Sequence, residues 1–219
     1  MRDPGGRARR PAAVVSAVRV TGIVLAGSSA RRSAAATTLV EFGGRPILHH
    51  ASLAVASVAD EVVVVIGPDA GRPPLPSDAA VRVRVVRAAV GGRGPIAELA
   101  AGLAEARGDR AILVGGDEPG FPPALLDELL LWLDSTSGSH ALDVVVVSDR
   151  GSIRPVPAVL HVGSVRPAAA ALVDDQAGSL VGLFERLRVG TLEPDRWRVL
   201  DLHGASLRGV DTLEDRSGC

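Results

Sequence analysis

The chain has 219 residues, 25 acidic and 24 basic side chains and a net charge of −1, which argues against a nucleic-acid-binding surface. Its single cysteine, Cys219, excludes an internal disulfide framework, and no apolar run reaches the ~18 residues of a membrane span. We therefore expect a cytoplasmic protein whose partners are neither nucleic acid nor membrane.

All 24 basic residues are arginine, because the chain contains no lysine. This excludes a P-loop kinase and Schiff-base chemistry, so cationic catalysis has to use arginine, a metal ion or backbone amides. The first segment, 1–18, is basic and rich in proline and glycine, and we expect it to be a disordered arm. Residues 19–215 are then expected to form a single α/β domain.

Strand-like and helix-like segments alternate along this domain. The predicted elements, in chain order, are a strand over 18–27, a helix over 45–59, a buried strand over 61–67, an edge strand over 81–88, a helix over 94–108, a buried strand and turn over 110–120, a helix over 122–135 and a buried strand over 142–149. This order predicts a three-layer α/β fold, with a mostly parallel sheet and helices on both faces.

The remainder, 150–219, is less regular. We expect it to extend over the sheet edge, with a short strand at 157–162, helices at 165–175 and 179–189, and a strand-like segment at 197–202.

Ligands of parallel sheets bind outside the carboxyl ends of the strands, which directs attention to the loops that follow them. The first is LAGSSARRS, where the backbone amides of 26–31 can form an anion-binding concavity and Arg31 and Arg32 supply charge. The alternative is that the segment is only a strand end with solvated arginines.

The loop GGDEPG places Asp117 directly after a buried strand, where a carboxylate is costly unless it has a partner. A divalent cation such as Mg²⁺ is one such partner. The alternative is that Asp117 accepts backbone amides in the turn or caps the helix that begins near Pro122. The third loop, GGRGP, ends at Gly94 and Pro95 and allows close backbone approach to a ligand, but it does not match the dinucleotide fingerprint.

These loops, taken with FGGRPIL, GPIAEL, RPVPAVLH, SLVGLFERL and VDTLED, resemble a known family. It is the molybdenum cofactor guanylyltransferase group among the GT-A-like nucleotidyltransferases. Its members carry a strand ending in LAGGxSxRMGxxK, then GGKPLL, GPLAG and DxPF in the same order. The resemblance covers about residues 19–215.

The resemblance implies transfer of a nucleoside monophosphate from an NTP, GTP or CTP, to a phosphorylated acceptor such as molybdopterin, with release of pyrophosphate. It implies that Leu25, Ala26 and Gly27 lie against the nucleotide and that Arg32 contacts the phosphates. It also implies that Asp117 holds Mg²⁺, and that Gly94 and Pro95 line the site.

The chain departs from the family pattern at several positions. Ser28 replaces the second glycine, and Thr37 or Thr38 falls where the family has its lysine. Arg87 aligns with the aspartate that binds the guanine base, so the resemblance implies that Arg87 lies at the nucleotide, although arginine cannot accept hydrogen bonds from the base as a carboxylate does. Arg31 is a candidate substitute for the lysine. These departures leave an alternative function, a catalytically weakened homologue that binds nucleotide or a partner protein without efficient turnover.

Overall fold

The computed structural model describes residues 19–27, 39–89, 94–173, 179–202, 204 and 207. The main sheet is formed by β1 (Val20–Leu25), β4 (Glu61–Ile66), β5 (Arg82–Arg87), β6 (Arg110–Gly115), β7 (Val144–Asp149), β8 (Ser152–His161) and β9 (Val189–Leu192), while β2 (Glu41–Phe42) and β3 (Arg45–Pro46) pair separately. The helices are α2 (Ile47–Ala56), α3 (Pro95–Glu105), α4 (Pro123–Ser135), α5 (Val162–Val173), α6 (Leu180–Phe184) and α7 (Pro194–Trp197), with a 3₁₀ turn at Gly138–His140.

The sheet has the strand order β5-β4-β1-β6-β8-β7-β9. Its first four strands are parallel, β8 is antiparallel to both of its neighbours, and β9 is parallel to β7. The central parallel strands are apolar on both faces, and Val62–Val65 has 0% exposure throughout. This confirms the predicted mostly parallel α/β sheet, and β5 lies at an edge as expected.

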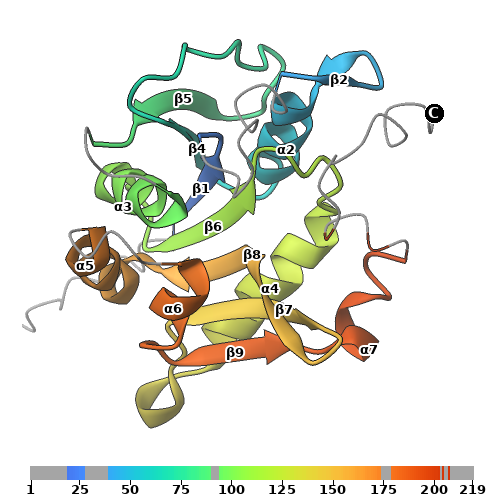
Figure 1. Cartoon of the computed structure of the whole chain (residues 1–219). Helices are drawn as coiled ribbons and strands as arrows, with labels where there is room; N and C mark the ends of the chain where they lie inside the picture. The colour runs from blue at the N-terminus through green and yellow to red at the C-terminus, as the bar shows by residue number, and fades with distance from the viewer. Residues whose placement is uncertain are drawn as a thin grey trace, which may run out of the picture.

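Two layers of helices cover the sheet (Figure 1). Val24 and Val114 belong to the core shared with α2 and α4, whereas Ile23 and Leu113 belong to the core shared with α3, α5 and α6. The alternation along β1 and β6 therefore assigns each residue at the strand ends to one face. None of the helices that the structure describes is both long and apolar enough to cross a bilayer.

The structure differs from our expectations in the C-terminal part. Residues after 150 do not merely extend over the sheet edge, because β8 runs through the sheet interior between β6 and β7. The expected strand at 197–202 is wrong, since α7 ends at Trp197 and turns follow it. The expected helix over 179–189 is shorter, with β9 beginning at Val189. Apolar spacing in such short segments fits a helix and a strand equally well, so packing decided between them.

Candidate active site

The carboxyl ends of β1, β4, β5 and β6 lie at one edge of the sheet because these strands are parallel. The chain leaves β1 toward β4 and β5 on one side, then returns through α3 to β6 on the other side of β1. Strand order therefore reverses between β1 and β6, where Leu25 pairs with Gly115. An open α/β sheet binds its ligands at such a point. We call this point, formed by the carboxyl ends of β1 and β6 and the turns that follow them, the crevice.

The turn after β1 is packed tightly against the end of β4. The amide of Ala26 donates a 2.7 Å hydrogen bond to the carbonyl of Val65. At Gly27, an added Cβ would overlap the backbone nitrogen of Gly67 and would lie 2.7 Å from Oε1 of Glu98. Only glycine fits here, so the close approach of the two turns explains this residue.

Glu98 reaches this turn from the first turn of α3. Its Oε2 accepts a hydrogen bond from the Gly27 amide at 3.2 Å, across 71 positions of sequence, and the residue is only 2% exposed. The crevice thus has a buried carboxylate on the α3 side, directly against the backbone that was predicted to hold phosphates.

Asp117 lies beside the same turn. The amide of Gly116 donates to the carbonyl of Leu25 at 2.8 Å, which ties the end of β6 to the end of β1. A Cβ built on Gly115 would lie 2.9 Å from Oδ1 of Asp117 and 3.2 Å from Oε2 of Glu118. Both carboxylates therefore fold back over the bare backbone at the end of β6.

Arg87, Gly94 and Pro95 come from the neighbouring strand end and the helix start. The guanidinium of Arg87 donates to the carbonyls of Pro68 and Ala70, so it holds the turn that follows β4. Gly94 has φ 86°, a conformation that favours glycine, and Pro95 is the first residue of α3.

The remaining predicted residues, Ser28, Arg31, Arg32 and Thr37, lie outside the described residues. The structure places Leu25, Ala26, Gly27 and Asp117 together at the crevice, with the start of α3 beside them.

Residues 22–189 match the model of the MobA-like NTP transferase domain. The chain belongs to this family. Its enzymes are nucleotidyltransferases, so the resemblance drawn from the loops is confirmed, and the chain is assigned to that class of enzyme. No curated protein matches the chain in sequence.

Solved structures agree on the fold. The molybdopterin-guanine dinucleotide biosynthesis protein A of Archaeoglobus fulgidus superposes with a TM-score of 0.69, at 18% identity, over 90% of this chain and 95% of its own. The 4-diphosphocytidyl-2C-methyl-D-erythritol synthase of Anaerococcus prevotii gives 0.65, at 13% identity, over 91% and 95%. Rv0371c of Mycobacterium tuberculosis, solved in complex with manganese, gives 0.58, at 21% identity, over 91% and 96%.

The donor set of this MobA-like chain fits a hard divalent cation. Asp117 and Glu118 offer carboxylate oxygens on one side of Gly115, and Mg²⁺ commonly takes one or two carboxylates together with substrate phosphates. The described part of the chain contains no group of three or more histidine, cysteine or acidic side chains placed to hold a metal. A cation here would therefore depend on nucleotide oxygens for the rest of its ligands.

A hollow of about 150 Å³ adjoins the crevice between the ends of β1 and β4. Its lining is formed by Ala26, Leu39, Ile66, Ala70, Gly71, Arg72 and Pro73. Ala70, whose carbonyl accepts a hydrogen bond from Arg87, is part of this lining. Arg87 thus shapes the hollow by holding the backbone carbonyls of the turn that follows β4.

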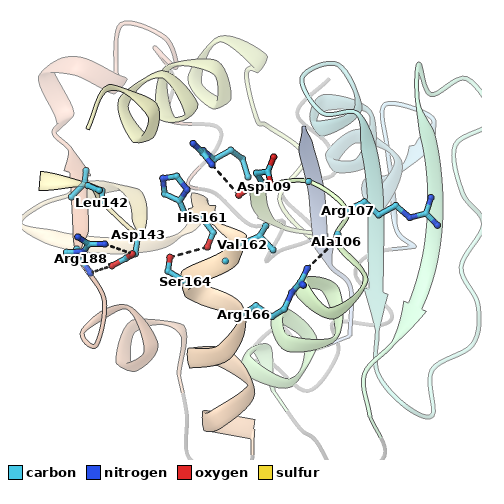
Figure 2. Close-up of a pocket in the computed structure, with 14 residues that line it drawn as sticks. Ala106, Arg107, Asp109, Leu142, Asp143, His161, Val162, Ser164, Arg166 and Arg188 are labelled. Atoms are coloured by element: carbon cyan, nitrogen blue, oxygen red, sulfur yellow. Dashed lines mark hydrogen bonds and ion pairs between the residues drawn. The ribbon is translucent and has the colours of Figure 1, made fainter. Parts of the chain in front are cut away.

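A larger pocket of about 620 Å³ lies at the opposite edge of the sheet, near the start of β6 and β7 (Figure 2). Arg188 donates from Nε and Nη2 to Asp143 at 3.0 Å each, and Arg166 donates to the carbonyl of Ala106. Arg188 lowers the pKa of Asp143 from 3.8 to about 2. Burial lowers the pKa of His161, and the charge of Arg110 lowers it further. This pocket is separate from the crevice at the carboxyl ends of β1 and β6.

Glu98 and Glu118 were not among the predicted site residues. The sequence did contain a signal for Glu98: in GPIAEL a glutamate stands at the fifth position, where the family motif GPLAG has a glycine. Glu118 directly follows Asp117, but a strand pattern that ends in a turn does not show which side chains fold back over the sheet.

Proposed function

We propose that the chain transfers a nucleoside monophosphate from GTP or CTP to a phosphorylated small-molecule acceptor such as molybdopterin. The Archaeoglobus neighbour is named for a guanine dinucleotide and the Anaerococcus neighbour for a diphosphocytidyl product, which supports these two nucleotides. The observation that carries the proposal is the Asp117 carboxylate at the end of β6, where that strand is tied to the turn after β1.

In this reaction an oxygen of the acceptor phosphate attacks the α-phosphorus of the nucleotide. A new phosphorus–oxygen bond forms as the bond from the α-phosphorus to its bridging oxygen breaks, and pyrophosphate leaves. The protein contributes orientation and charge neutralisation rather than covalent chemistry.

Each group at the crevice has a part in this proposal. The backbone of Leu25, Ala26 and Gly27 forms the floor for the nucleotide, and the start of α3 at Gly94 and Pro95 closes one side. Asp117 and Glu118 would hold Mg²⁺, which supplies neutralising charge to the phosphates when it is bound. Ser28, Arg31, Arg32 and Thr37 are assigned to the phosphates by their motif positions alone.

The test is pyrophosphate release from GTP, CTP, ATP and UTP with Mg²⁺ and a panel of phosphorylated acceptors that includes molybdopterin. We expect Asp117→Asn to lower turnover ~100- to 1,000-fold, because it removes one preorganised electrostatic partner. The matched control is Asp127→Asn, the same change at an exposed position of α4, which should keep wild-type turnover. Equal rates in the two variants would remove Asp117 from the mechanism, and a wild-type protein without any release would end the proposal.

The alternative function, a weakened homologue that binds nucleotide without efficient turnover, is favoured by one specific observation. Glu98 is already hydrogen-bonded to the Gly27 amide, so an acidic side chain occupies a backbone donor at the place where the phosphates are proposed to lie.

A further inference from the structure

Glu98 is the most deeply buried acidic side chain at the crevice. Its Oε2 accepts the Gly27 amide at 3.2 Å, and its Oε1 lies 2.7 Å from the point where a Cβ on Gly27 would stand. Both oxygens therefore face the turn after β1, and with 2% of the residue exposed they have little access to bulk water.

The fold explains why a carboxylate is stable at this position. Gly94, at φ 86°, and Pro95 begin α3, so Glu98 lies within the first turn of a helix of 11 residues. The positive end of the helix dipole favours negative charge there, and so does the backbone amide that points at the carboxylate. The same two features are what phosphate-binding sites at helix starts and backbone turns use.

We propose that the Glu98 carboxylate takes the place of a phosphate at the Gly27 amide and thereby limits how tightly the crevice holds a triphosphate. The inference rests on the proposed function, because it takes the turn after β1 as the phosphate site. Glu98 is a residue that sets nucleotide affinity. It does not contact the reacting atoms.

Two physical consequences follow. The Gly27 amide already donates its hydrogen bond to Glu98, so a bound triphosphate has one backbone donor fewer at this turn. A fixed negative charge within a few ångströms of the phosphate chain also repels it, and the repulsion is larger in a buried setting than in water. Removing the charge while keeping the shape should therefore strengthen nucleotide binding.

The experiment is calorimetric titration of GTP, CTP and inorganic tripolyphosphate, with Mg²⁺, into the full-length chain. Glu98→Gln keeps an oxygen that accepts the Gly27 amide and removes the charge, so we expect at least ~10-fold tighter binding than in wild type. Glu105→Gln is the matched control. It lies at the end of the same helix, with a half-exposed side chain paired to Arg84, and should bind like wild type.

A second variant separates this role from a purely structural one. Glu98→Ala removes both the charge and the acceptor, which leaves the Gly27 amide available to an anion, so we expect it also to bind more tightly than wild type. If Glu98 only supported the turn, Glu98→Ala would bind more weakly and Glu98→Gln would be unchanged, and that result would overturn the inference.

The outcomes also separate this inference from the proposed function. If wild type binds nucleotide and neither Glu98 variant binds more tightly, the inference fails and the proposed function stands. If only the Glu98 variants bind, the inference holds and efficient turnover by the natural chain is refuted. If no protein in the set binds nucleotide or tripolyphosphate, both fail.

Discussion

The substitution Gly27→Ala tests the geometry on which the site depends. The added methyl group would overlap the backbone nitrogen of Gly67 and would lie 2.7 Å from Oε1 of Glu98 and 3.0 Å from the Gly67 Cα. Ordinary carbon contacts are about 3.5–4.0 Å, so the turn after β1 has to move by roughly 1 Å. Backbone atoms form most of this contact, so a side-chain rotation cannot relieve the overlap.

The expected cost follows from this overlap. Overpacking of this kind destabilises a fold by about 1–3 kcal/mol, and each kcal/mol lowers the Tm of a domain of this size by about 2–4 °C. A shift of about 1 Å in a turn that positions substrate is also expected to cost ~100-fold in turnover. Thermal unfolding followed by circular dichroism measures the first effect, and pyrophosphate release measures the second.

Gly67→Ala is the matched control for stability, because the two glycines face each other but differ in the space around them. A Cβ on Gly67 would have no atom within 4 Å, and its backbone is not in a conformation that requires glycine. We expect its Tm to stay close to that of wild type. If Gly27→Ala and Gly67→Ala unfold at the same temperature, the close packing of the two turns is refuted.

Two further predictions concern stability. Arg188→Ala should destabilise the fold at neutral pH, because the hydrogen bonds from Arg188 hold the pKa of Asp143 at about 2 rather than 3.8; the loss should be small, since the Arg188 side chain is 56% exposed and solvent screens the pair. The stabilisation is fully present above pH ~4 and is lost as the pH falls through about 2, so urea unfolding of the variant and wild type should converge across that window; a difference that stays constant down to pH 2 would contradict it. Thr21→Val should cost about 1–3 kcal/mol, because the buried Thr21 hydroxyl donates to Glu61 and accepts the Gly108 amide at 2.9 Å. Thr191→Val, on the edge strand β9, is its control in thermal unfolding, and equal losses in the two variants would show that the Thr21 hydrogen bonds contribute nothing.

Much of the site was predictable because it depends on local patterns. The apolar runs around Val62–Val65 and Ile112–Val114 are apolar at every position, which indicates strands buried on both faces and hence a parallel sheet. Carboxyl ends of parallel strands meet at one edge, so the turn at Gly27 and the carboxylate at Asp117 were expected to lie near each other. The structure places them on adjacent strand ends.

Other features depend on contacts between residues far apart in the chain. The spacing of apolar residues does not state which strand pairs with which, so the position of β8 between β6 and β7 was not foreseen. The hydrogen bonds from Arg87 to two carbonyls of a neighbouring turn were not foreseen either. Both the strand order and the hydrogen bonds of Arg87 depend on which groups lie close together in the folded chain, and those neighbours exist only once the sheet has formed.

The sequence by itself determined the type of the main strands and helices up to β7, the burial of the central strands and the chemistry of the loops that follow them, because these depend on neighbouring residues and on the backbone. Only the tertiary structure decided that Glu98 meets Gly27, 71 positions away. This contact forms because α3 packs on the sheet, which brings the start of that helix to the turn after β1. The Glu98 carboxylate can then accept the hydrogen bond of the Gly27 amide.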